Sequence, residues 1–325
     1  MKLRAKGKVF LAGEYAVLER GRPALVVGID KFLEATVEPA NEISIEHGGA
    51  VWRSGPPPPE LRFAVRAVQL ATPARPFRLV YENELALGGK KLGLGGSAAA
   101  TVVAVRAARP ELSEEETLPL AVAAHFIEQG GSGSGGDVAA SCLGGILRVE
   151  SRLPWDSAEQ AMSSSLEELL RARPVEAQRV RTPSDLRLLL AFTGESADTR
   201  VLVKRVRALF AGDRPRWRIC EAAITRACET LIDALERSDA EAALQAVRDG
   251  AAAMARLGDA AQAPIVTPAL AKACALAASA GAAAKPSGAG GGDCAVVLAF
   301  GDEMRDRAEA ALAPHFETFR VAPAW

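Results

Sequence analysis

Apolar residues in this chain occur in short runs and in longer, helically spaced runs, and the two kinds are interspersed from end to end. Short apolar runs bounded by glycine, proline or polar residues predict β-strands. They cover residues 9–11, 24–29, 34–38, 43–46, 77–81, 186–192, 294–300 and 316–321. Longer runs without a breaker predict α-helices, and these cover residues 61–70, 97–108, 113–129, most of 199–256, and a charged segment from 302. Helix and strand therefore mix throughout the chain.

The chain is long enough for two lobes. With 325 residues, each half can bury a core of its own. Residues 154–183 are polar, irregular in pattern and bounded by prolines, as is typical of a boundary between lobes. We therefore expect a first lobe over residues 1–182 and a second over residues 183–325.

Charge and cysteine content narrow the classes of function. The formal net charge is −1, which gives no overall field to attract nucleic acid or an anionic membrane, so a small-molecule partner is expected. The five cysteines are odd in number and never form C-x-x-C, which argues against a disulfide framework and against a zinc site. No apolar run approaches membrane-spanning length, and a reducing cytoplasm is the simplest expectation.

A glycine-rich segment precedes the helix predicted at residue 97. Glycines let the backbone approach an anion, and a helix N-terminus offers free N–H groups and the positive end of a dipole. Ser97 adds a hydroxyl that could meet the anion or its Mg²⁺. A tight turn between two core elements is the structural alternative. The segment has neither the Walker nor the Rossmann pattern.

Two further glycine-rich segments end in aspartate. The first covers residues 130–137, and Asp137 is either a helix N-cap or a catalytic acid. Five glycines in the seven residues before it exceed what a cap needs and suggest a ligand passing close to the backbone. The other segment covers residues 285–293, for which a hinge is the alternative. Lys8 taken alone is a surface lysine, and His125 is interpreted as a packing residue.

Three segments in this order resemble the three motifs of the GHMP kinases. They cover residues 8–18, 93–99 and 285–294. Within that superfamily, the phosphomevalonate kinases in particular are similar at residues 13–18, at 133–140, at 193–194 with Ala197 and Thr199, and at the end of the third motif. Each motif alone is a weak signal, whereas the three together span nearly the whole chain and form a strong one.

The resemblance implies an α+β fold of two lobes, the N-terminal one like a ribosomal protein and the C-terminal one ferredoxin-like. It implies ATP and Mg²⁺ as cofactors and phosphomevalonate as acceptor, in the mevalonate route to isoprenoids. It assigns catalysis to Lys8 and Asp137, and Mg²⁺ binding to Ser97. The triphosphate loop would be Gly93, Leu94, Gly95, Gly96, Ser97 and Ala98. Acceptor binding would involve Ser134, Gly135, Thr199, Lys285, Ser287, Gly288, Ala289 and Gly290.

Two positions depart from the family pattern. Gly96 stands where the family usually has a serine, and Gly131 where related sequences often have a lysine. The acceptor phosphate would then need another cation, for which the candidates are Arg106, Arg200, Lys204 and Lys285. Glu128 is a candidate second metal ligand or a solvated carboxylate at a helix end. A mevalonate kinase, another GHMP kinase, and a non-catalytic sensor of the same fold remain the alternative functions.

Overall fold

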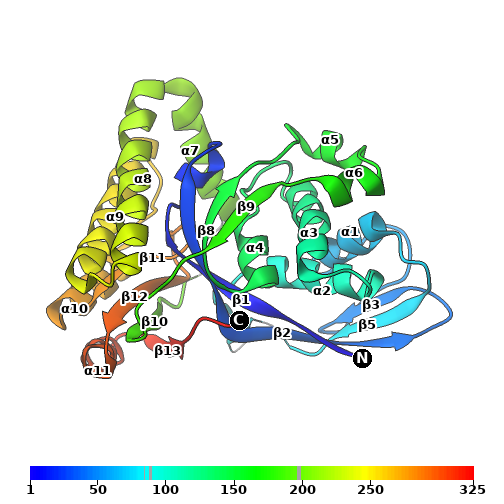
Figure 1. The fold of residues 1–325 in the computed structure, drawn as a ribbon, viewed down its shortest axis with the longest axis horizontal. Helices are drawn as coiled ribbons and strands as arrows, with labels where there is room; N and C mark the ends of the chain where they lie inside the picture. The colour runs from blue at the N-terminus through cyan, green and yellow to red at the C-terminus, as the bar shows by residue number, and fades with distance from the viewer. Residues whose placement is uncertain (84, 88–89, 196–198) are drawn as a thin grey trace.

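The computed structural model describes residues 1–83, 85–87, 90–195 and 199–325, and it has two lobes lying side by side (Figure 1). Ala197, which carries part of the family resemblance, lies outside the described residues. Each lobe has one main β-sheet covered by helices, so the predicted α+β fold is confirmed. No helix in the described part of the chain is long and apolar enough to cross a membrane.

The long strand β2 (Pro23–Pro39) organises the first lobe. One of its edges pairs with β1 (Lys2–Ala12), and the other pairs with β8 (Gly145–Ser151) and then β5 (Phe77–Tyr81), all antiparallel. The remaining strands of this sheet are β3 (Ser44–His47), β4 (Ala50–Trp52) and β9 (Val175–Arg179). The predicted strand at 9–11 was too short for β1, and the two strands predicted at 24–29 and 34–38 are parts of the single strand β2, because charged residues interrupt the apolar runs while backbone pairing continues.

Helices rich in alanine and valine cover one face of this sheet. They are α1 (Arg62–Ala71), α2 (Gly96–Ala108), α3 (Glu114–Glu128) and α4 (Gly136–Leu143). Small side chains let α2 and α4 lie close against β1, with Ala98, Ala99, Val102 and Ala139 fully buried. The spacing of Ser113 and Glu116, three residues apart, predicts a capping box at the start of α3, and the structure confirms it, because the two residues exchange side-chain and backbone hydrogen bonds. Short helices α5 (Ala158–Met162) and α6 (Leu166–Arg171) flank this layer.

The second lobe has an antiparallel sheet in the order β11 (Ala283–Pro286), β12 (Cys294–Phe300), β10 (Leu186–Phe192) and β13 (Glu317–Val321). Successive residues of β10 face opposite sides. Leu188 and Leu190 pack toward α8 (Arg214–Glu236) and α9 (Ala240–Ala261), while Leu189 packs toward α10 (Pro268–Ser279) and α11 (Asp302–Leu312). Helix α7 (Thr199–Gly212) packs on α8 and α9. Neither α10 nor β11 was predicted from the sequence.

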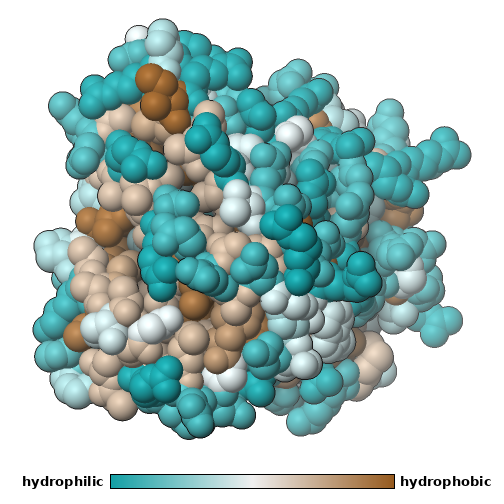
Figure 2. Space-filling model, turned by 60° about the vertical axis from the view of Figure 1, so that its left-hand side comes forward, coloured by the Kyte–Doolittle hydropathy of each residue, from teal (hydrophilic) through white to brown (hydrophobic). Residues whose placement is uncertain are grey.

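The outer side of the second lobe has both apolar and hydrophilic residues on its surface. Figure 2 shows this side, where pale-brown apolar residues are interrupted by teal hydrophilic ones. The exposed large apolar side chains of α7 and α8 are Val201, Phe210 and Ile219, and the Arg214 guanidinium lies 3.7 Å from the centre of the Phe210 ring.

The two lobes share a hydrophobic core. Val9 and Leu25 of the first sheet belong to one buried cluster with Leu190 and Val296 of the second. Strand β9 still pairs within the first sheet, whereas β10 begins the second, so the division predicted at 182/183 falls between these strands. The last residues return to the first lobe, where the Ala324 N–H donates to the Gly28 carbonyl at 2.8 Å. The lobes are therefore joined through this shared core, where β1 contacts β12 and β13 contacts β2, and again at the chain terminus.

A buried ion pair crosses between the lobes. The Lys285 ammonium of β11 contacts the Glu14 carboxylate of the first lobe, and the two residues are only 1% and 3% exposed. Lys285 Nζ also donates to the Pro286 carbonyl, whereas Glu14 Oε2 finds no hydrogen-bond partner among the described residues. Lys285 therefore differs from the predicted loop residue that would bind the acceptor, because it lies in a strand with its charge held by Glu14.

We predict that Lys285→Met strongly destabilises the protein. Removing one partner leaves the other charge buried and uncompensated, which typically costs about 3–5 kcal/mol in the free energy of unfolding. The double variant Glu14→Gln/Lys285→Met leaves no uncompensated charge and should recover much of the loss. Urea denaturation measures both variants, and Lys2→Met, at an exposed pair with Glu82, is the control that should barely move the midpoint. A double variant as unstable as Lys285→Met would contradict the explanation.

Candidate functional site

The N-terminus of α2 has the features of an anion site. Gly93 and Gly95 have φ values of 71° and 81°, a region that glycine enters readily and other residues rarely adopt. Gly95 is the N-cap, so no side chain caps this end, and the first turn of α2 within the described chain contains no acidic residue. The N–H groups and the positive end of the dipole therefore have no competing carboxylate from their own helix.

Lys8 of β1 lies against this loop. Its backbone N–H donates to the Leu94 carbonyl at 2.8 Å, and its Nζ lies 3.4 Å from the Gly93 carbonyl oxygen. The aliphatic part of the side chain crosses over Gly95, since a Cβ added there would come within 2.6 Å of Lys8 Cγ. Lys8 is thus a lysine directed along the glycine-rich loop and not the ordinary surface lysine that the sequence alone would suggest.

Three helices bring Ser97, His125 and Asp137 together. Ser97 stands in the first turn of α2, and its Oγ lies 3.1 Å from Nε2 of His125 on α3. The same Nε2 lies 3.7 Å from Oδ2 of Asp137, which is in the first turn of α4. His125 therefore links Ser97 and Asp137, both of which were predicted to act at the site.

The prediction for His125 as a packing residue missed this link. The sequence did contain a signal for it, because the buried residues of α3 are otherwise apolar apart from Thr117. His125 is 2% exposed, and burial lowers its pKa, an effect that Lys8 and Arg62 increase and Asp137 opposes. The imidazole is consequently neutral near pH 7.

The third glycine-rich loop closes over the first from the second lobe. The carboxylate of Asp293 lies where a side chain on Gly93 would stand, 2.8 Å from an added Cβ. Ser287 Oγ accepts the Phe10 N–H at 3.0 Å, and the Ala289 carbonyl accepts the Tyr15 hydroxyl at 2.6 Å. All three motifs that carry the family resemblance are therefore in contact.

Some of the other residues predicted to bind the acceptor are tightly packed, and others are open to solvent. Ser134 is buried, with its Oγ accepting the Gly136 N–H at 3.3 Å, and Gly135 packs so closely that an added Cβ would come within 2.5 Å of Val175. Gly290 is similarly tight against the Ile265 carbonyl, whereas Gly288 faces open space. Thr199 begins α7 and is exposed.

Two of the candidates for a second metal ligand or an extra cation form ion pairs with other side chains. Glu128 forms an ion pair with Arg66 at 2.9 Å, and Arg106 pairs with Glu114 at 2.8 Å. No group of three or more metal-ligating His, Cys, Asp or Glu side chains occurs within the described residues. The oxygens of Ser97 and Asp137 nevertheless fit Mg²⁺, which commonly takes one or two protein oxygens and completes its shell with phosphates and water.

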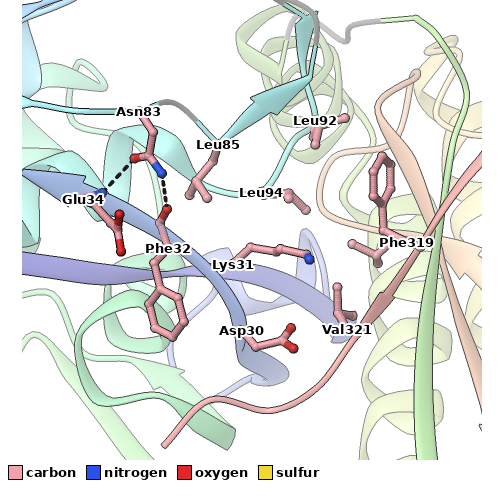
Figure 3. A pocket seen from close by; sticks show the side chains of 11 residues that line it. Asp30, Lys31, Phe32, Glu34, Asn83, Leu85, Leu92, Leu94, Phe319 and Val321 are labelled. Carbon is pink, nitrogen blue, oxygen red and sulfur yellow. Dashed lines mark hydrogen bonds between the residues drawn. The ribbon is translucent and has the colours of Figure 1, made fainter.

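A separate cavity of about 380 Å³ lies behind the loop, at the junction of the lobes (Figure 3). Leu92 and Leu94 line it from the first lobe, and Phe319 lines it from β13. Asn83 closes one side by bonding to the Glu34 N–H and the Phe32 carbonyl, so its amide is already satisfied. Lys8, Ser97 and Asp137 are not among its lining residues in the described chain. The Leu94 side chain therefore faces this cavity, on the side of the loop away from the three predicted site residues.

Comparison with known proteins matches both halves of the chain to one family. The family model described as "GHMP kinases N terminal domain" matches residues 61–145, and "GHMP kinases C terminal" matches residues 231–318. A phosphomevalonate kinase from Streptomyces sp. (strain CL190) is 33% identical, over 93% of this chain and 90% of its own length.

Solved structures share the fold. Streptococcus pneumoniae phosphomevalonate kinase, in complex with phosphomevalonate and AMPPNP, aligns with a TM-score of 0.85 at 22% identity over 98% of this chain and 99% of its own. The L. major mevalonate kinase aligns with a TM-score of 0.71 at 20% identity over 99% and 95% of the two chains. The resemblance found in the sequence is thus confirmed: the chain belongs to the GHMP kinases and is related within that family to phosphomevalonate kinase.

Proposed function

We propose that this kinase transfers the γ-phosphate of ATP to (R)-5-phosphomevalonate, giving 5-diphosphomevalonate and ADP. The observation that carries the proposal is the arrangement of Lys8, Ser97 and Asp137 around the open N-terminus of α2. The choice of acceptor is supported by the Streptomyces relative and by the pneumococcal enzyme, which was solved with phosphomevalonate. In the reaction an acceptor phosphate oxygen bonds to the γ-phosphorus while the bond to the β–γ bridging oxygen breaks, and ADP leaves with that electron pair.

The residues from Gly93 to Ala98 hold the ATP phosphates in this proposal. Backbone N–H groups at the start of α2 point toward the anion, and the dipole favours negative charge there. Gly96 needs no hydroxyl for this role, since the donors are backbone groups. Ser97 and Asp137 supply oxygens to Mg²⁺, which when bound neutralises phosphate charge.

Lys8 carries the larger catalytic role in the proposal because the acceptor is an anion. An alcohol must lose a proton before it attacks, and a general base is then worth roughly 10² to 10⁴ in rate. A phosphate monoester has a second pKa of about 6 and is mostly a dianion near pH 7. The main obstacle is therefore bringing two negative groups together, which the Lys8 ammonium offsets. Asp137 chiefly orients Lys8 and the metal-bound phosphates.

The acceptor is proposed to bind between the loop at Ser134 and the loop from Ser287 to Gly290. The open side of Gly288 provides room for a ligand, whereas Gly135 and Gly290 shape the loops by close packing. Ser287 holds Phe10 and so sets the distance between the third loop and β1. Thr199 is proposed to contact the acceptor from the start of α7. Lys285 contributes indirectly, by fixing the strand from which this loop departs.

We predict that phosphomevalonate with MgATP yields ADP at a far higher kcat/KM than mevalonate does. ADP release with each acceptor and without one also separates the alternatives. Comparable turnover of mevalonate would indicate a mevalonate kinase, turnover of another alcohol alone would indicate a different GHMP kinase, and no turnover at all would indicate a non-catalytic sensor.

Gly95 and Gly96 form a matched pair for testing the triphosphate loop. We predict that Gly95→Ala lowers kcat by on the order of tenfold to a hundredfold, because its Cβ displaces Lys8 and because its φ is unfavourable for alanine. Gly96→Ser should retain near-normal activity, because nothing lies within 4 Å of an added Cβ. Steady-state kinetics with phosphomevalonate measure both variants. Equal losses in the two would show that the loop is not positioned as proposed.

We predict that Lys8→Met lowers kcat by on the order of 10² or more while the KM for ATP changes only several-fold. This is the signature of an interaction made mainly in the transition state. Asp137→Asn should also lower kcat, but without the steep rise of residual rate with pH that follows loss of a base acting on an alcohol. The rate is measured from pH 6 to pH 9, with circular dichroism as the control for folding. A near-normal kcat in Lys8→Met would contradict the proposal that the Lys8 ammonium offsets the charge of the two phosphate groups.

A further inference from the structure

His125 occupies a place that packing alone does not explain. A buried imidazole must find hydrogen-bond partners or pay a desolvation penalty. The partners within reach of its Nε2 are the side chains of Ser97 at 3.1 Å and Asp137 at 3.7 Å. They come from two other helices, and both belong to the proposed Mg²⁺ and phosphate site. The ring is thus a bridge between α2 and α4.

The shape of the surroundings fixes the ring. Phe63 of α1 lies against it, with ring centroids 5.0 Å apart and planes at 32°. The side chain is only 2% exposed, so it cannot turn out to solvent to satisfy its nitrogen. The packing therefore holds Nε2 toward the two oxygens.

The two oxygens near Nε2 decide whether this nitrogen carries a proton. A lone pair on Nε2 would face the negative carboxylate of Asp137, which is unfavourable. An N–H on Nε2 would instead be attracted to that carboxylate and could donate to Ser97 Oγ. The hydroxyl hydrogen of Ser97 must then point away from His125, and one oxygen lone pair remains for a cation.

We propose that His125 is a positioning residue that donates from Nε2–H to Ser97 and holds Ser97 and Asp137 in register at the metal-phosphate site. This inference rests on the proposed roles of Ser97 and Asp137. It adds a residue that acts through its neighbours and touches neither nucleotide nor acceptor. Outer partners of this kind typically contribute 10–100-fold to metal affinity or activity.

The tautomer is tested first, in the ligand-free protein. In ¹⁵N-histidine NMR spectra we expect a protonated Nε2 and an unprotonated Nδ1 for His125, and a shift of the Nε2–H signal in Ser97→Ala. An unprotonated Nε2, or a signal indifferent to Ser97→Ala, would overturn the proposal. This measurement does not depend on which acceptor the enzyme uses, so it separates failure of this inference from failure of the proposed function.

Two variants then test the consequence. His125→Phe keeps an aromatic ring against Phe63 but removes the donor, whereas His125→Gln keeps an amide donor. We expect His125→Phe to weaken MgADP binding and to raise the Mg²⁺ concentration for half-maximal rate by about tenfold or more. His125→Gln should recover most of both, and the KM for phosphomevalonate should change little in either variant.

The control is Phe126→Leu on the same helix, where the ring packs on Trp155 with centroids 6.1 Å apart. It should leave the Mg²⁺ requirement unchanged even where it lowers the melting temperature. Calorimetry of MgADP binding and a Mg²⁺ titration of the rate measure all three variants. Equal impairment in His125→Phe and His125→Gln would show that the ring acts only through its bulk, and an unchanged Mg²⁺ requirement in His125→Phe would likewise overturn the proposal.

Discussion

The buried ion pair between Lys285 and Glu14 sets the geometry on which the site depends. Both charges are out of contact with solvent, so neither tolerates a shift of one lobe relative to the other. Lys285 stands near the end of β11, at the start of the third glycine-rich segment. Fixing that strand fixes where Ser287 meets Phe10 and where Asp293 lies over Gly93. The ion pair between Lys285 and Glu14 therefore stabilises the fold and also aligns the loops of the site.

Close packing on the other side of the site continues the same constraint. Gly95 leaves just enough space for the Lys8 side chain to cross the loop, and the Leu94 carbonyl holds the Lys8 backbone. Leu94 in turn faces the cavity between the lobes. The direction of the Lys8 ammonium thus depends on two neighbouring residues. Gly95 has no side chain to collide with Lys8, and the apolar Leu94 beside it holds the Lys8 backbone.

The sequence predicted best where a local pattern decides the structure. Strands such as β5, β10 and β12 were found with their bounds, and the capping box at Ser113 follows from two residues three apart. It failed where tertiary contacts decide. Lys285 was predicted to be a loop residue because its partner Glu14 is 271 residues away in the sequence. Strand β11 was missed because it is stabilised by pairing with β12. His125 differs from its apolar neighbours, but its contacts are with the side-chain oxygens of Ser97 and Asp137, which lie on two other helices.

Charge balance explains why this site needs several weak positive features. The chain as a whole has a net charge of −1, so it offers no general attraction for two phosphate groups. In the proposed site, Asp137 adds a further negative charge where the acceptor and the γ-phosphate would meet. A helix end contributes roughly half a positive charge, and Lys8 contributes one. Because burial lowers the pKa of His125, it adds none near pH 7. In the proposed mechanism Mg²⁺ offsets the remaining negative charge, and the Asp137 carboxylate would then assist only if it faces the cation and not the incoming dianion.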